Sequence, residues 1–275
     1  MSALGGAVVT GAGQGLGREI ALRLARRGYA VHVTDRDLRL AKETVDLAGE
    51  RAWASALDVR DYEGCRTAAE QAVERAGRLD LWVNNAGILI TGPMWDRPMD
   101  VWEQVLEVNA IGTLHGVGAA LEQMRPTKRG HIVNIASLAG LSAVPGEAVY
   151  AASKHAVVGL SGSTLADLRR AGLKDIHISV ICPDGMWTPM LYDRLEEDEA
   201  AMSFSGTLLQ PSQVADLVER VVDKPRPITS APSWRGGLAR VGSASPAFAL
   251  AALPAVHKMG RVQQRRLAKK LNRTG

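Results

Sequence analysis

The chain has 275 residues, of which 46% are hydrophobic and 23% charged, with two cysteines and six histidines. This composition is typical of a globular protein with a sizeable core and excludes a disordered or low-complexity chain. Cys65 and Cys182 are far apart and the histidines form no metal-ligating pair, so we expect a reduced, cytoplasmic setting and no metal. The first residues lack a charged leader followed by a long apolar run, so we expect no signal peptide.

The net charge of +4 is unevenly distributed along the chain. Residues 1–223 hold 22 of the 33 basic side chains and all 29 acidic ones, which gives this part a charge of −7. Residues 224–275 hold the other 11 basic side chains and no acidic one. The basic character therefore belongs to the C-terminal segment. Nucleic-acid binding is disfavoured, because the larger part is acidic and the basic segment has only two aromatic residues, Trp234 and Phe248.

Strand-like and helical patterns alternate along most of the chain. Short runs of apolar and β-branched residues predict six strands, at 6–10, 29–35, 52–59, 78–87, 130–137 and 175–183. Amphipathic patterns predict a first helix through Leu16, Ile20, Leu24 and Ala25, and further helices at 37–49, 61–77, 100–125 and 147–171. This alternation predicts an α/β fold with a doubly wound parallel sheet (Rossmann fold), in three α/β/α layers and a single domain.

A glycine-rich loop follows the first predicted strand. The stretch "TGAGQGLG" (10–17) places Gly11, Gly15 and Gly17 between that strand and a helix. Glycine permits a tight turn and lets backbone N–H groups approach a pyrophosphate at the helix N-terminus. A glycine loop alone can be an ordinary turn, but its position between a strand and a helix favours dinucleotide binding.

The second predicted strand ends at Asp35, which bears on the choice of cofactor. An acidic side chain at this point can accept hydrogen bonds from the adenosine ribose hydroxyls. It would repel a 2′-phosphate, and Gln14 in the loop adds no positive charge. Arg36 could grip such a phosphate, although a solvated charge is the simpler interpretation. The sequence thus favours NAD over NADP.

Six motifs occur in the order and spacing of one family. "TGAGQGLG" is followed by "LDV" (57–59), "NNAG" (84–87), "VNAIG" (108–112), Ser137 in "NIASLAG", and "YAASK" (150–154). On these motifs the chain resembles the short-chain dehydrogenase/reductase family over residues 7–190. The thirteen-residue step from Ser137 to Tyr150 also matches. Each motif alone could arise by chance, but independent accidents do not share one register.

The resemblance implies a catalytic set of Asn109, Ser137, Tyr150 and Lys154. A free phenol, with a pKa of about 10, is a poor base, and the Lys154 ammonium one helical turn away is expected to lower the pKa of Tyr150. Tyr150 then exchanges a proton with the substrate hydroxyl as hydride moves to or from the cofactor. Ser137 hydrogen-bonds the substrate oxygen, Lys154 also holds the nicotinamide ribose, and Asn109 holds a water that joins Lys154 to solvent.

The cofactor site is expected to run from the glycine loop to the catalytic residues. Its expected members are Gly11, Gln14, Gly15, Leu16, Gly17, Asp35, Arg36, Asp58, Val59, Asn85, Ala86, Gly87, Tyr150, Lys154, Pro183 and Thr188. Asp184, next to Pro183, stands where the family usually has glycine. Its carboxylate either binds a polar substrate group or is structural, with the glycine moved to Gly185, and we favour the structural interpretation.

The segment 186–210 is expected to cover the substrate, with substrate contacts from Ser137, Tyr150, Trp187 and Met190. Its apolar and soft side chains favour a hydrophobic alcohol or ketone. The leading hypothesis is an NAD-dependent oxidoreductase that interconverts a hydrophobic secondary alcohol and its ketone. The alternatives are an NADP-dependent carbonyl reductase of lipid, steroid or ketoacyl type and a non-catalytic dinucleotide-binding protein. The intact catalytic set argues against the second alternative.

The composition changes after residue 223. We predict a catalytic domain over 1–230 and a basic helical extension over 231–275, and the short final strand of many family members is not predicted here. The extension is too short, and too broken by Pro254, to span a bilayer. It is expected to pack on the domain, on a neighbouring subunit or on a membrane surface, with a subunit slightly favoured over a membrane. The acidic run at 196–199 is interpreted as a solvated helix face, and the family implies a homodimer or homotetramer.

Overall fold

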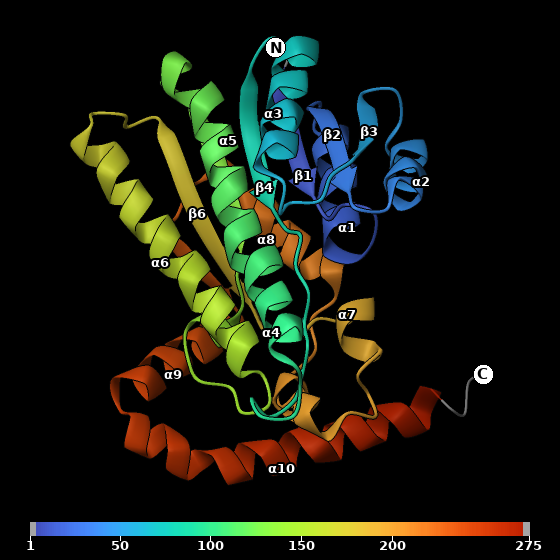
Figure 1. Cartoon of the computed structure of the whole chain (residues 1–275), viewed down its shortest axis with the longest axis vertical. Helices are drawn as coiled ribbons and strands as arrows, with labels where there is room; N and C mark the ends of the chain where they lie inside the picture. Colours follow the sequence, from blue (N-terminus) through green and yellow to red (C-terminus); the bar gives the residue numbers. More distant parts are fainter. Residues whose placement is uncertain (1–3, 272–275) are drawn as a thin grey trace.

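The computed structural model describes residues 4–271 and has a parallel sheet at its centre (Figure 1). The strands are β1 (Gly6–Thr10), β2 (Ala30–Asp35), β3 (Ala52–Ala56), β4 (Leu79–Asn84), β5 (Gly130–Ile135), β6 (Ile176–Pro183) and β7 (Ile228–Ala231). They lie in the order β3-β2-β1-β4-β5-β6-β7, and all neighbouring pairs are parallel. The strand order changes direction between β1 and β4, which is where a doubly wound sheet binds its ligand. The predicted fold class is confirmed.

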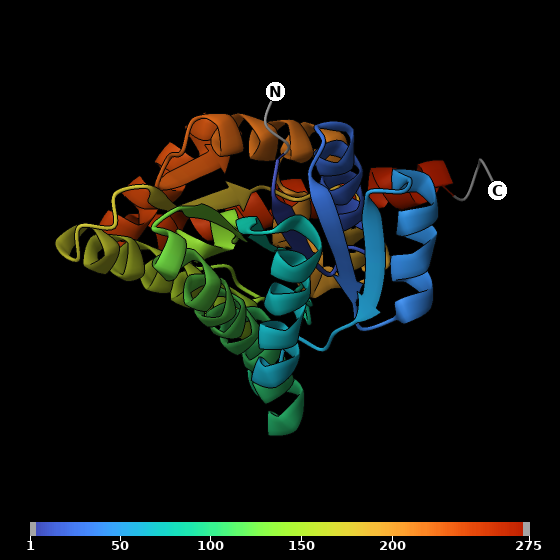
Figure 2. The ribbon, with the colours of Figure 1, turned by 90° about the horizontal axis from the view of Figure 1, so that it is seen from above.

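Helices cover both faces of the sheet (Figure 2). They are α1 (Gly15–Arg26), α2 (Leu38–Ala48), α3 (Tyr62–Ala76), α4 (Met99–Leu106), α5 (Gly112–Thr127), α6 (Ala148–Arg170), α7 (Pro189–Tyr192), α8 (Pro211–Asp223), α9 (Ser233–Ala244) and α10 (Pro246–Leu271), with η1 (Glu107–Ile111), η2 (Leu138–Gly140) and η3 (Asp198–Phe204). The buried faces of α1 and α8 pack on one side of the sheet, and those of α3 and α5 on the other. Apolar side chains alternate between the two cores along β1, where Val9 belongs to one and Val8 to the other.

Several features differ from the sequence expectation. The strands β3 and β4 end before their predicted limits of 59 and 87, and α8 was not predicted. The predicted helix at 100–125 is divided by a π-helical turn, η1, which lies between α4 and α5. The expectation that the short final strand is absent is wrong, because β7 pairs with β6 at the edge of the sheet. The residues of β7, "ITSA", carry no clear alternation, and prolines lie on either side of them. Pairing with β6, rather than local preference, makes this segment a strand.

The last two helices form a separate layer below the carboxyl ends of the strands (Figure 1). There α10 packs on η3 of the same chain. Gln264 Nε2 donates to the carbonyl oxygens of Arg194 and Glu197 at 3.0 and 2.7 Å, and Arg261 forms an ion pair with Asp198. The acidic run at 196–199 therefore meets α10 rather than solvent alone. Within residues 4–271, no helix is long and apolar enough to cross a membrane.

Candidate active site

A cavity of about 270 Å³ lies at the carboxyl ends of β1, β2 and β4. Gly11 and Gly15 have φ angles of +60° and +55°, which glycine adopts without strain. A Cβ on Gly17 would be 2.2 Å from the carbonyl oxygen of Gly11, so the helix can approach the loop this closely only with glycine. The loop thereby presents the N-terminus of α1 to the cavity.

Asn85 holds the glycine loop from the neighbouring strand end. Its Nδ2 donates to the carbonyl oxygens of Thr10 and Gly11 at 2.9 and 3.0 Å. The backbone N–H groups of Asn85 and Ala86 both donate to Thr10 Oγ1. The "NNAG" segment therefore fixes the shape of the loop as well as lining the cavity.

Acidic side chains lie at the end of the cavity beside β2. Asp35 accepts hydrogen bonds from the N–H groups of Gly13 and Asp37, at 2.9 and 3.0 Å, and lines the cavity. Asp58 is engaged by Arg60 through bonds of 2.6–3.1 Å, and this pairing lowers the pKa of Asp58. Two acidic side chains therefore line this end of the cavity, where they can accept hydrogen bonds from a ribose diol and would repel a 2′-phosphate.

Tyr150 and Lys154 lie on α6 at the opposite end of this cavity. Lys154 Nζ is 5.6 Å from the centre of the Tyr150 ring and donates to the Ile135 carbonyl oxygen at 3.1 Å. Burial lowers the pKa of Lys154 to about 8. Burial, with Glu147 nearby, raises the pKa of Tyr150, and a hydrogen bond with Ser137 opposes this. In this structure desolvation dominates, so the pKa of Tyr150 is raised, contrary to the expected lowering by Lys154.

Asn109 sits in the π-helical turn η1 and is fully buried. Its Oδ1 accepts from Ile88 N at 2.8 Å, and its Nδ2 donates to Ile88 O at 2.9 Å and Ser153 Oγ at 3.1 Å. A Cβ on Gly87 would be 3.2 Å from Asn109 Oδ1 and 3.5 Å from Lys154 Nζ. Asn109 and Lys154 therefore flank the same glycine, and π-helical turns of this kind are frequent at functional sites.

The comparisons with known proteins agree with this geometry. Residues 6–199 match the family model described as short chain dehydrogenase. The chain belongs to the short-chain dehydrogenase/reductase family.

Characterised relatives and solved structures of this family resemble the chain over much of its length. A CLA biosynthesis dehydrogenase/reductase of Lactiplantibacillus plantarum is 36% identical over 67% of the chain, and the match spans 65% of that relative. A cyclopentanol dehydrogenase of a Comamonas species is 33% identical, over 77% of the chain and 86% of the relative. The crystal structure of a short-chain dehydrogenase/reductase from Burkholderia phymatum in complex with NAD has a TM-score of 0.81 and 29% identity, over 90% of the chain and 95% of that structure. Like its family, the chain is an oxidoreductase.

Most of the expected cofactor residues line one cavity in this short-chain dehydrogenase/reductase. These are Gly11, Gln14, Gly15, Leu16, Gly17, Asp35, Arg36, Asp58, Val59, Asn85, Ala86, Gly87, Tyr150, Lys154 and Thr188. The residues present therefore fit a dinucleotide: a glycine cradle for the pyrophosphate, a carboxylate for the ribose, and Lys154 beside Tyr150 at the far end. Met190 lines the same cavity.

Two expected contacts differ in the structure. Pro183, expected at the cofactor, is buried as the last residue of β6 and does not line this cavity. Trp187, expected at the substrate, packs its ring against Tyr192 at 5.6 Å and lines neither this cavity nor the second one described below. The sequence reasoning also missed several residues that do line it: Leu57, Arg60, Ile88, Val108, Ile135, Ala136, Met186 and Pro189. Arg60 and Ile88 directly follow recognised motifs, and that adjacency was the signal available for them. No cluster that could hold a metal ion occurs in the part of the chain that the structure describes.

A second cavity, of about 410 Å³, begins at Ser137. We call it the apolar cavity, because most of its walls are hydrocarbon. It is lined by Ser137, Leu138, Ala139, Ser142, Ala143, Val144, Glu147, Asp184, Gly185, Met202, Ser203, Ser205, Trp234, Arg235, Leu238, Ala239, Val241, Gly242, Ala252, Leu253, Val256 and Met259. Ser137 lines the apolar cavity and Tyr150 the cofactor cavity, and the two cavities are neighbours, since Ala136 and Met186 line one and the adjacent Ser137 and Gly185 line the other.

Proposed function

We propose that the protein is an NAD-dependent oxidoreductase that interconverts a hydrophobic secondary alcohol and its ketone. The observation that carries this proposal is the position of Ser137 and Tyr150, which line neighbouring cavities: Tyr150 lines the one with the glycine loop, and Ser137 lines the apolar one. A carbinol oxygen bound to both side chains would have its carbon facing the nicotinamide end of the cofactor cavity. Its hydrocarbon substituents would lie among apolar side chains.

The chemistry follows from these positions. When bound, NAD supplies the acceptor for the hydride that leaves the carbinol carbon. The Tyr150 phenolate takes the hydroxyl proton, so the products are a ketone, NADH and protonated Tyr150. The reverse reaction consumes a ketone, NADH and that proton. Ser137 donates a hydrogen bond to the oxygen, and Lys154 holds the ribose and adds positive charge beside the phenol. The positive charge of the oxidised nicotinamide opposes the burial that raises the pKa of Tyr150.

The assignment of NAD rests on Asp35 and on Arg18. Arg18, on α1, does not line the cofactor cavity and is engaged elsewhere: it donates to the Gly13 carbonyl oxygen, to Thr44 at 3.0 Å and to Glu43 at 3.2 Å. Arg36 is exposed and lines the cavity near Asp58, and its charge helps to lower the pKa of that carboxyl. The NAD in the Burkholderia phymatum structure supports the same choice. An NADP-dependent carbonyl reductase is the alternative.

Replacement of Tyr150 tests the mechanism. Tyr150→Phe removes the proton-transfer group while leaving the ring in place, so we expect kcat with a secondary alcohol and NAD to fall by about 10²–10⁴-fold. The dissociation constant for NADH, measured by nicotinamide fluorescence, should change little. Activity retained in the variant would exclude Tyr150 as the acid–base group, and a wild-type protein that binds NADH but oxidises no secondary alcohol would favour a non-catalytic dinucleotide-binding role.

We further propose a cytoplasmic homodimer or homotetramer. Exposed apolar side chains along α4 to α5, at Leu106, Ile111 and Leu114, support a self-association face. Leu114→Glu should lower the mass measured by light scattering after gel filtration.

Peripheral membrane contact through the basic side of α10 is the alternative role for that helix, and co-sedimentation with anionic vesicles tests it.

A further inference from the structure

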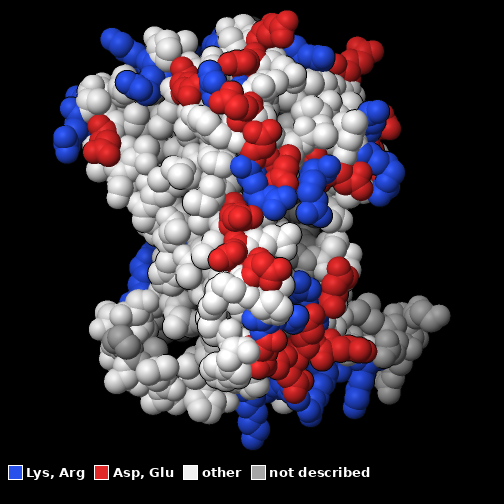
Figure 3. Space-filling view, in the orientation of Figure 1, with Lys and Arg blue, Asp and Glu red and all other residues white. Residues whose placement is uncertain are grey.

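The apolar cavity owes one of its walls to the C-terminal helices, which lie outside the segment matched by the family model. The helix α9 contributes Trp234, Leu238 and Val241, and α10 contributes Leu253, Val256 and Met259. The opposite wall comes from the segment after β5, with Ser137 at its inner end. Figure 3 shows a hollow between the C-terminal helices and the rest of the fold.

We propose that the apolar cavity is the substrate site of this oxidoreductase and that α9 and α10 set its specificity, for an uncharged secondary alcohol or ketone with an extended hydrocarbon chain. This inference rests on the proposed function and adds to it where the substrate lies and what limits its length. A volume of 410 Å³ lies within the range of about 300–1,000 Å³ usual for ligand cavities. Each methylene that such a wall removes from water strengthens binding about fourfold.

Among the described residues, the one arginine that lines the cavity is already paired, and the buried glutamate is hydrogen-bonded. Arg235 Nε lies 3.0 Å from Asp184 Oδ2, and the other end of the guanidinium donates to Ser205 Oγ at 3.0 Å. Glu147 is buried and accepts a hydrogen bond from Ser203 at 2.5 Å. The pair at Asp184 is nearly buried, with 7% of the aspartate side chain exposed. A carboxylate on a substrate would therefore find, among the residues within 4–271 that line the cavity, no basic side chain other than a guanidinium that is already engaged.

Asp184 also explains how α9 is held over the cavity. The departure from the family's glycine provides, at the end of β6, the ion-pair partner for Arg235 at the start of α9. Gly206 permits this arrangement, because a Cβ there would be 2.1 Å from Arg235 Nη1 and 2.3 Å from Asp184 Oδ2. The ion pair between Asp184 and Arg235 thus positions α9 as a wall of the apolar cavity.

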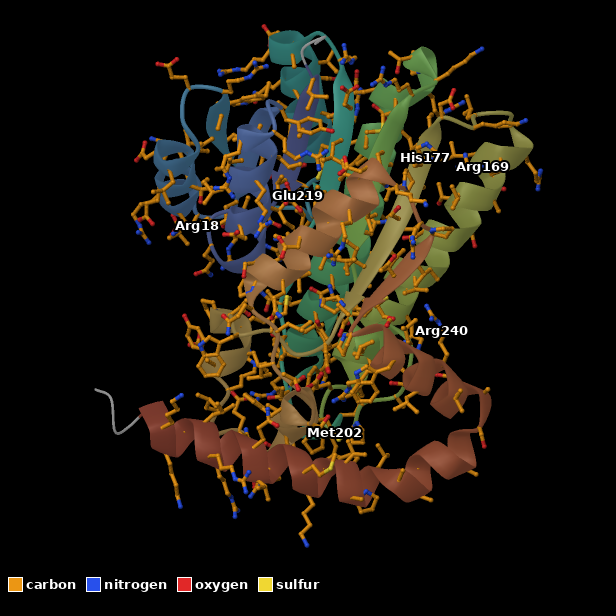
Figure 4. All side chains as sticks on the ribbon, turned by 180° about the vertical axis from the view of Figure 1, so that it is seen from behind. Arg18, Arg169, His177, Met202, Glu219 and Arg240 are labelled. Carbon is orange, nitrogen blue, oxygen red and sulfur yellow. The ribbon has the colours of Figure 1, made fainter. Side chains whose placement is uncertain are left out.

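The helix α10 is fixed independently. Gly260 lies so close to η3 that a Cβ would be 1.9 Å from the Ala201 carbonyl oxygen. Gln263 Nε2 donates to the Gly206 carbonyl oxygen at 2.8 Å. Met202, on η3, lies between α10 and the domain (Figure 4) and lines the apolar cavity. The wall of the apolar cavity that α10 forms is therefore held in place by packing and hydrogen bonds within the fold.

The test compares substitutions at two valines on α10. Val256 lines the cavity, whereas Val262, six residues along the same helix, is 44% exposed and does not line it. The readout is the ratio of kcat/KM for 2-decanol to that for 2-butanol with NAD. We expect Val256→Phe to lower this ratio at least tenfold by filling the cavity, and Val256→Thr, which keeps the shape, to lower it about threefold or more. The matched variants Val262→Phe and Val262→Thr should leave it within twofold.

A second comparison tests the charge argument and separates the two proposals. Wild-type protein should prefer 2-decanol over 9-hydroxydecanoate, which has the same chain and hydroxyl position, by at least tenfold in kcat/KM. Calorimetric binding of 2-decanone should weaken in the Val256 variants and not in the Val262 variants. An unchanged ratio in both Val256 variants, or equal effects at Val262, overturns the cavity assignment while alcohol oxidation stands. If binding of 2-decanone depends on Val256 but no alcohol is oxidised, the proposed function is rejected instead. A preference for 9-hydroxydecanoate over 2-decanol would contradict the proposal that the substrate chain is uncharged.

Discussion

At the level of single residues, Asp35 and Asp58 define one end of the cofactor cavity in different ways. Asp35 is held by backbone N–H groups and lines the cavity. Asp58 is held by Arg60, which also lies 3.4 Å from Glu107. The motif around Asp58 predicted that this residue contacts the cofactor. It did not predict the ion pair between Asp58 and Arg60, which depends on the local turn of the chain.

Asp35 provides a test of cofactor choice. Asp35→Asn removes the negative charge that repels a 2′-phosphate, so the ratio of kcat/KM for NADP to that for NAD should rise at least tenfold. Initial rates with both cofactors measure this. Asp37→Asn is the matched control, because Asp37 caps α2 from outside the cavity and asparagine caps as well. Equal ratios in wild type and Asp35→Asn would remove Asp35 as the discriminating group.

At the level of elements, the sequence predicted the parts that follow from local periodicity. β1, β5 and β6 fall within one or two residues of their predicted limits, because their apolar runs are bounded by turn residues. The arrangement of Ser137, Tyr150 and Lys154 was predictable from the motifs. Ser137 follows the end of a predicted strand, and Tyr150 and Lys154 lie one turn apart on the next predicted helix. β7, η1 and the apolar cavity were not, since each depends on contacts between segments distant in sequence.

The docking of α10 gives a prediction at this scale. Gly260→Ala would bring its Cβ within 1.9 Å of the Ala201 carbonyl oxygen, so α10 has to shift away from η3. We expect a loss of about 1–3 kcal/mol in the free energy of unfolding, and a higher KM for 2-decanol. Gly237→Ala on α9 is the control, because nothing lies within 4 Å of its Cβ. It should be neutral or stabilising by about 0.5–1 kcal/mol. Equal unfolding midpoints for the two variants in urea would contradict tight docking of α10.

At the level of the whole molecule, three ionisable side chains lie beside the two cavities: Glu147 and Lys154 are buried, and Tyr150 is partly buried. Burial raises the pKa of Glu147 from 4.5 to about 7, while its hydrogen bond with Ser203 and the charge of Arg194 oppose this. The folded protein therefore binds a proton at Glu147 that the unfolded chain releases between these values. The proton bound at Glu147 therefore adds to the free energy of unfolding. This contribution is fully present below pH 4.5 and is lost as the pH rises to about 7.

Replacement of Glu147 should flatten this part of the pH dependence. Glu147→Gln cannot ionise, so the stability of wild type relative to the variant should fall by on the order of 3 kcal/mol between pH 4.5 and pH 8. Melting temperatures across that range measure the effect, with the exposed Glu199→Gln as control. Parallel curves for wild type and Glu147→Gln would show that Glu147 is ionised throughout.

The separation of the two cavities along the chain has an evolutionary consequence. The residues that line the cofactor cavity all precede residue 191, whereas one wall of the apolar cavity follows residue 233. A gene that exchanged its last segment with a relative would keep its coenzyme and its acid–base residues while acquiring a new fit for the substrate. The pair Asp184–Arg235 is the exception, since it joins the two parts. Its two members are therefore expected to be inherited together, and lineages that lost one would be expected to lose the other.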